Sequence, residues 1–171
     1  MTDWHIRTST AASAPQLISE VLLSALCVIF IGCAVWLSLI DIREHRLPNR
    51  ILYPWAAVTA GLLLLTALLG GEPGVFGRSM LAGGAWSGGL ALTRLIRPPP
   101  VGAGDVKLAA VLGMYAGYAG WTVLCGAVLL SFLFGGAVSA GLMLARRVSR
   151  GDRLPFGPFL LAGTACALGL R

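Results

Sequence analysis

The chain has 171 residues, of which 57% are hydrophobic and 12% are charged, and its mean hydropathy is +0.82. This composition is too apolar for a soluble domain of this length and predicts an integral membrane protein. The formal net charge is +6. Basic loops on one side of a membrane, in contact with anionic lipid, account for this charge. We therefore expect lipid, and no nucleic acid, as a partner. The four cysteines fall in apolar runs without a CxxC pair, so we expect neither a disulfide framework nor a bound metal.

Six apolar runs follow one another along the chain, at residues 17–40, 51–70, 79–96, 105–119, 121–145 and 159–170. A helix needs about 20 residues to cross about 30 Å of hydrocarbon, so the last run is short for a full span. The sequence therefore predicts an all-α fold, a polytopic membrane bundle of about six transmembrane helices. We expect a short extracytoplasmic segment over residues 1–16 and a six-helix membrane domain over residues 17–171.

Basic residues concentrate in the three loops that follow the first, third and fifth runs. With Lys107, ten of the thirteen cations belong to this side of the chain. The loop cations are Arg43, Arg46, Arg50, Arg94, Arg97, Arg146, Arg147, Arg150 and Arg153. The positive-inside rule places these loops in the cytoplasm and both termini on the opposite side of the membrane. We expect this membrane to be the cytoplasmic (inner) membrane.

Glycines are dense at residues 83–89 and 113–120. Small residues let helix backbones approach closely in lipid, where no hydrophobic driving force brings helices together. We interpret these glycines as packing positions in a compact bundle, and not as a phosphate-binding loop.

Two aspartates lie at the same end of this predicted bundle. Asp41 directly follows the first apolar run and Asp105 opens the fourth, and these two helices run in opposite directions, so both carboxyls reach the cytoplasmic boundary. An ionisable group at that depth is a functional candidate. Asp105 also fits a simple helix-capping role, whereas Asp41 ends its helix, where its charge opposes the helix dipole unless Arg43 and Arg46 offset it.

Two neighbouring carboxyls share a proton, so one serves as an acid while the other remains a base. This is the protonation state of an aspartic protease, in which the base activates water and the acid protonates the scissile carbonyl; no metal or other cofactor is needed. Gly102 and Gly104 leave room for a substrate backbone beside Asp105 and allow a positive φ. We expect Pro48 and Asn49 to shape the turn between the first two helices.

The sequence resembles the type IV prepilin peptidases, membrane aspartic proteases of the GxGD type. Their motifs, Asp-x-Arg-x-x-x-Ile-Pro-Asn and Gly-x-Gly-Asp, read here "DIREHRLPN" at residues 41–49, with Leu47 in place of Ile, and "GAGDVK" at residues 102–107. A third stretch, "LPFGPFLLAG" at residues 154–163, resembles the start of the family's last helix.

The resemblance implies a peptidase that removes the short basic leader of prepilins or pseudopilins at the cytoplasmic face, after a glycine that precedes their apolar helix. It assigns catalysis to Asp41 and Asp105. It assigns the active-site loops the following residues: Gly102, Gly104, Lys107, Arg43, Pro48 and Asn49. For Lys107 the alternative is that its chain extends to lipid headgroups.

The chain also departs from the larger members of this family, which carry an N-terminal cytoplasmic region with paired CxxC motifs and methylate the new pilin terminus. Here about sixteen residues precede the first predicted helix, and CxxC is absent, so we do not expect N-methyltransferase activity. The layout is closer to the small peptidases that serve Flp-type pili, or to archaeal preflagellin peptidases.

Other functions remain open at this point. A small transporter or a pilus-assembly scaffold would use the acidic pair for ion or proton binding. Presenilin-like proteases also contain a glycine-aspartate motif, but their first aspartate lies within a helix, whereas Asp41 is expected to open a loop. The particular prepilin and the oligomeric state are not determined by the sequence.

Overall fold

The structure is a computed structural model, and it describes residues 14–44, 47–95, 102–146 and 155–170. The described chain forms six α-helices. They are α1 (Ala14–Glu44), α2 (Asn49–Leu69), α3 (Pro73–Thr93), α4 (Ala103–Ala119), α5 (Trp121–Leu144) and α6 (Gly157–Gly169). The prediction of an all-α bundle of about six helices is confirmed. The segment expected over residues 1–16 lies almost entirely outside the described residues, as do Arg46, Arg97, Arg147, Arg150 and Arg153.

The largest differences from the predicted helix ends are at the end of α1 and the start of α3. The first helix does not stop at Ile40 but continues to Glu44, so Asp41 lies in its last turn and does not open a loop. The third helix begins at Pro73, six residues before the predicted start, because proline is favoured at the first helical position. Arg78, which precedes the predicted third run, lies inside this helix and donates to the Gly117 and Tyr118 carbonyl oxygens at 2.8 and 2.7 Å.

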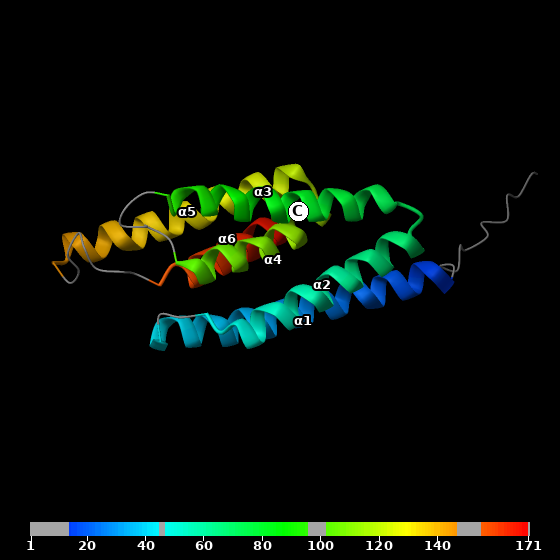
Figure 1. Ribbon diagram of the computed structural model, residues 1–171, viewed down its shortest axis with the longest axis horizontal. Helices are drawn as coiled ribbons and strands as arrows, with labels where there is room; N and C mark the ends of the chain where they lie inside the picture. The colour runs from blue at the N-terminus through cyan, green and yellow to red at the C-terminus, as the bar shows by residue number, and fades with distance from the viewer. Residues whose placement is uncertain (1–13, 45–46, 96–101, 147–154, 171) are drawn as a thin grey trace, which may run out of the picture.

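Four longer helices surround a central pair of shorter ones. In Figure 1, α1 and α2 run along one side of the bundle, α3 and α5 run along the opposite side, and α4 and α6 lie between them. The helix α4 contacts α2, α3, α5 and α6, while α6 contacts α1, α4 and α5. Residues at the start of α4 and of α6 can therefore meet residues from α1 and α2.

Three of the described helices are long and apolar enough to cross a membrane: residues 15–43, 49–69 and 121–144. Large apolar side chains on α1 face outward, among them Val28, which is 70% exposed, as lipid-facing residues are. The helix α6 has only 13 residues, as its short apolar run predicted. These features, with the family assigned below, identify an integral membrane protein.

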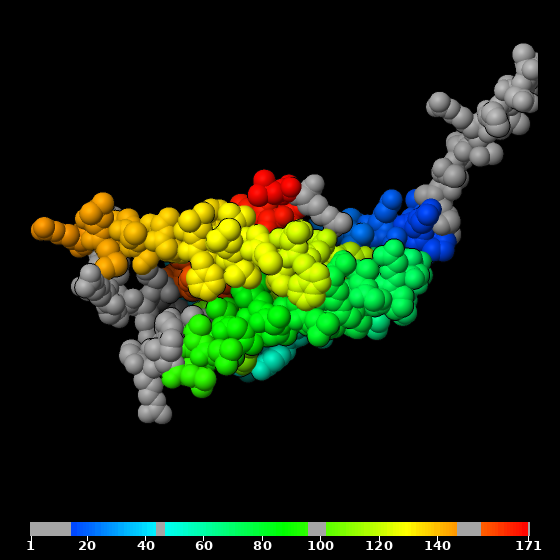
Figure 2. Space-filling view, turned by 90° about the horizontal axis from the view of Figure 1, so that it is seen from above, coloured from blue at the N-terminus to red at the C-terminus, as the bar shows by residue number. Residues whose placement is uncertain are grey.

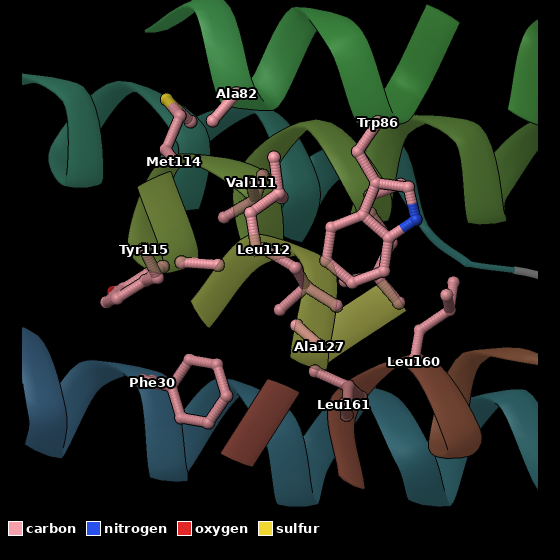
Figure 3. Close-up of a cluster of buried hydrophobic side chains, with 14 of the residues drawn as sticks. Phe30, Ala82, Trp86, Val111, Leu112, Met114, Tyr115, Ala127, Leu160 and Leu161 are labelled. Carbon is pink, nitrogen blue, oxygen red and sulfur yellow. The ribbon is translucent and has the colours of Figure 1, made fainter. Parts of the chain in front are cut away.

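Apolar side chains fill the centre of the bundle. Figure 3 shows Trp86 of α3 against Val111 and Leu112 of α4, with Leu160 and Leu161 of α6 on the other side. All five are at most 5% exposed. This cluster packs around α4, so the helix that carries Asp105 is held from several sides.

The face formed by α3 and α5 is apolar and hollowed. Figure 2 looks onto this face, where α5 is yellow to orange and α3 is green. A groove of about 600 Å³ lies between the two helices and is lined by Trp86, Leu90, Leu124 and Phe132, among others. A surface of this kind suits the hydrocarbon interior of a membrane.

Candidate active site

Asp41 is buried in the last turn of α1 and contacts the first residue of α6. Its side chain is 5% exposed, and its Oδ2 accepts a hydrogen bond of 3.1 Å from the Gly157 backbone N–H. The first N–H groups of a helix have no partner within the helix, and the N-terminal end of the dipole favours negative charge. The start of α6 therefore offsets the unfavourable position of Asp41 at the C-terminal end of α1, a role the sequence had left to Arg43 and Arg46.

Gly157 also has to be a glycine at this contact. A Cβ added to it would lie 2.6 Å from Asp41 Oδ2 and 3.2 Å from Asp41 Cγ. Pro158 follows directly in the first turn of α6, where the absence of its N–H costs no intrahelical bond. The "FGP" sequence thus starts the helix and brings its first N–H group against the carboxylate.

Asp105 is buried in the first turn of α4. Its side chain is 8% exposed, and its Oδ2 accepts a hydrogen bond of 3.2 Å from the backbone N–H of Gly102, the residue before the helix. The predicted capping contact is therefore present. A carboxylate has two oxygens and several lone pairs, so this contact leaves Asp105 capable of a second role.

The fold brings Asp41 and Asp105 together from opposite parts of the chain. The helices α1 and α4 both contact α6, and the charge of Asp41 acts on Asp105. Both carboxyls are buried, as predicted from their place at the ends of apolar runs. A buried, mutually interacting pair of carboxyls is an arrangement that proteins use for acid and base chemistry.

The two glycines before Asp105 serve purposes that differ from those expected. Gly102 has φ −67° and ψ 154°, so no positive φ is used there. A Cβ on Gly104 would lie 2.8 Å from Leu47 Cβ, so the space beside this glycine is occupied by the chain itself and not left for a substrate backbone. Gly104 instead permits the loop after α1 to lie directly against α4.

Pro48 and Asn49 begin α2, in agreement with the expected turn. Pro48 is extended, with φ −72° and ψ 123°, and its carbonyl accepts hydrogen bonds from the N–H groups of Ile51 and Leu52. Asn49 is the first helical residue, and its Oδ1 accepts a bond of 2.8 Å from Lys107 Nζ. Lys107 thus contacts the other motif that the sequence singled out, in place of the lipid headgroups considered as an alternative.

Arg43 lies in the last turn of α1, and its side chain is exposed. Its position one residue before the end places a positive charge where the C-terminal end of the helix dipole favours one.

Sequence reasoning assigned no role to Gly157 or Leu47, although both lie in stretches that were recognised. The available signal was the glycine before Pro158 at the start of an apolar run. A glycine inside a helix lowers stability by roughly 1 kcal/mol relative to alanine. Its presence at this position therefore pointed to a close contact with another part of the chain.

A family comparison agrees with this geometry. The model of the "Type IV leader peptidase family" matches residues 27–140, which include both aspartates. The chain belongs to the type IV leader peptidase family. The resemblance drawn from the two aspartate motifs is thereby confirmed, and the match extends over α2 and α3, which carry neither aspartate.

Relatives of this leader peptidase family are found in several bacteria. A protein named prepilin leader peptidase/N-methyltransferase from Bacillus subtilis is 32% identical over 140 residues, which are 82% of this chain and 53% of the relative. Proteins of the same name from Stutzerimonas stutzeri and Aeromonas hydrophila are 28% and 34% identical, over 96% and 74% of this chain and 52% and 42% of theirs. The chain spans about half the length of these relatives. A comparison with solved structures finds no match.

Proposed function

We propose that this chain is a membrane aspartic endopeptidase that removes the leader of prepilin-like substrates. The observation that carries the proposal is the buried pair Asp41 and Asp105, each of which accepts a backbone N–H from a glycine. The family match and the printed names of the relatives support prepilins as the substrate class.

In the proposed reaction, one carboxyl of the pair is protonated and the other is ionised, because two buried negative charges so close together are costly. The ionised aspartate takes a proton from a water molecule as its oxygen attacks the scissile carbonyl carbon. The protonated aspartate gives its proton to the carbonyl oxygen. As the C–N bond of the tetrahedral intermediate breaks, the leaving amine takes the proton that the first aspartate gained from water, and a hydroxyl of the intermediate returns a proton to the second aspartate. The glycine N–H groups hold both carboxyls in orientation throughout.

We place the reaction at the cytoplasmic face of the inner membrane. Both aspartates lie at the end of the bundle where the basic loops concentrate, and such loops are cytoplasmic by the positive-inside rule. Cleavage would follow a glycine that precedes the apolar helix of the substrate. Methylation of the new terminus is not part of the proposal.

A transporter or an assembly scaffold is the other class considered from the sequence. Secondary transporters place their sites near the bilayer midplane, on interrupted helices. Here the aspartates lie in the last turn of α1 and the first turn of α4, at helix ends. This position favours cleavage at a membrane surface over ion transport through the bundle.

The test is a cleavage assay with the purified chain in detergent and a prepilin that retains its leader. Asp41→Asn and Asp105→Asn preserve the shape of each side chain but remove its acid–base function. Because a positioned acid or base contributes about 10²–10⁴-fold and the pair acts as a unit, each variant is expected to lose about 10³-fold or more in kcat/KM.

Glu20→Gln is the matched control, because Glu20 is an exposed carboxylate on α1, 21 residues before Asp41, and this variant should cleave at the wild-type rate. Variants that elute as the wild type does and unfold at the same temperature exclude a loss through misfolding. Normal cleavage by either Asp41→Asn or Asp105→Asn would overturn the assignment and favour the transporter or scaffold.

A further inference from the structure

Lys107 joins two helices beside the carboxyl pair. Its Nζ donates a 2.8 Å hydrogen bond to Asn49 Oδ1 and lies 5.0 Å from the centroid of the Tyr53 ring. Asn49 and Tyr53 are one turn apart on α2, so the ammonium group contacts one continuous face of that helix. We call Lys107, Asn49 and Tyr53 the lysine bridge. Lys107 is also the one lysine of the sequence.

The lysine bridge is reinforced by a second contact one turn earlier on α4. Gly104 and Lys107 are three residues apart and share a helix face, and Leu47 packs against Gly104 so closely that a Cβ would lie 2.8 Å from Leu47 Cβ. The segment Leu47–Asn49 is thus held to α4 at both Gly104 and Lys107. Asp105 lies between these two contacts in the sequence.

The same segment follows α1 closely. Asp41 is in the last turn of α1, and Leu47 resumes the described chain three residues after that helix ends. The helix α2, which this segment opens, packs against α1, so a shift of the segment relative to α4 would also displace α1 and Asp41 in its last turn. The lysine bridge thus links the helices that carry Asp41 and Asp105 through residues other than these two aspartates.

We propose that Lys107 is a positioning residue which, through Asn49 and Tyr53, fixes the start of α2 against α4 and so sets the relative placement of Asp41 and Asp105. The proposal rests on the proposed peptidase function. A lysine that served only to reach lipid headgroups would not need an amide oxygen and a ring face as partners. Charge-assisted bonds of this kind are directional, which suits a residue that defines a distance.

The test compares Lys107→Met, Asn49→Ala and the double variant in the prepilin cleavage assay. Lys107→Met retains the length of the side chain but removes the ammonium group. Because a misplacement of about 1 Å can cost 10²-fold in rate, each single variant is expected to lower kcat by about 10- to 100-fold and leave KM within about twofold. The double variant should be no slower than the slower single variant, since both remove the same contact.

Two further variants distinguish positioning from general stability. Asn49→Asp retains an acceptor for Lys107 Nζ and should keep kcat within about threefold of the wild type. Arg50→Met is the matched control: it removes an exposed cation one residue further along α2, outside the bridge, and should cleave normally. Unchanged kcat in Lys107→Met, additive losses in the double variant, or no recovery in Asn49→Asp would each overturn the proposal.

A spectroscopic measurement tests the bridge even if a variant does not fold well enough to assay. Reductive ¹³C-methylation labels the single lysine and the N-terminal amine, and Lys107→Met identifies the lysine resonance by removing it. The Tyr53 ring should displace that methyl resonance by a ring current. Tyr53→Leu should abolish that displacement, and a resonance that does not move would overturn the bridge. Because this readout needs no substrate, its failure is distinguishable from failure of the peptidase assignment, which the aspartate variants test.

Discussion

The contact between α3 and α4 differs in kind from the contacts that join α1 and α2 to the rest of the bundle. Between α3 and α4 the backbones touch: a Cβ on Gly83 would lie 2.6 Å from the Ala110 carbonyl oxygen, and one on Gly113 would lie 2.7 Å from Gly83 Cα. Ser79 Oγ adds a 2.6 Å bond to the Met114 carbonyl oxygen.

The contacts of α1 and α2 combine apolar packing with a few polar side chains. Leu26 and Phe30 of α1 and Trp55 of α2 belong to the apolar core. Tyr115 of α4 receives hydrogen bonds from Trp55 and Thr59 of α2 and donates to the Leu26 carbonyl oxygen of α1, each at 3.3 Å. At the end that carries the carboxyls, Asp41 bonds to Gly157. Close backbone contacts at glycines thus distinguish the α3–α4 interface, whereas side chains make the contacts of α1 and α2. Under the proposed function, the geometry of the carboxyl pair depends on the second kind of contact.

The strongest test of this difference is Gly157→Ala. The added methyl group must displace the Asp41 carboxyl, since no room exists between them. We expect cleavage to fall by about 100-fold, because a displaced catalytic group loses its attack geometry, while the protein remains folded.

Gly169→Ala is the matched control in the same helix, since nothing lies within 4 Å of its added Cβ. It should cleave as the wild type does. A Gly157→Ala protein with full activity would show that the Asp41 position tolerates change, and the polar contacts would then not define the site.

A substitution in the glycine contact should act on stability and not on catalysis. Gly113→Ala places a methyl group against the backbone of α3, and such overpacking typically costs about 1–3 kcal/mol. We expect a lower unfolding temperature in detergent, with kcat per folded molecule unchanged. Gly88 is on α3, and nothing lies within 4 Å of a Cβ added there, so Gly88→Ala should leave the unfolding temperature unchanged or raise it slightly. Equal effects of the two substitutions would contradict the comparison.

The smallest expected effect is that of Tyr115→Phe. This change removes the hydroxyl that links α1, α2 and α4 but keeps the ring, which packs edge-on against Phe30 at 5.2 Å between centroids. Hydrogen bonds between membrane helices average about 0.6 kcal/mol, so a modest loss of unfolding free energy is expected. Steric trapping in bicelles can resolve a difference of that size, and Tyr53→Phe, which removes a hydroxyl from an exposed side chain of α2, provides the comparison. A loss as large as that of Gly113→Ala would mean that the polar contacts also carry the stability of the bundle.

Much of the fold was accessible from the sequence because a membrane constrains it strongly. Apolar runs long enough to span lipid, separated by basic loops, predicted six helices and their order. The errors lie at helix ends, where tertiary contacts decide. The helix α3 begins early because Pro73 suits the first helical position, and Arg78 then finds carbonyl acceptors near the end of α4. The helix α1 continues through Asp41 because the first N–H of α6 compensates for the charge.

The sequence by itself determined the class of protein, its family and the two aspartates worth testing, because each follows from residue type and from spacing within a short stretch. The tertiary structure alone decided that Gly157 supports Asp41, that Gly104 receives Leu47, and that Lys107 bonds to Asn49. These contacts join residues separated by up to 116 positions in the chain. Local patterns carry no information about such pairs, since each partner's position depends on how all six helices pack.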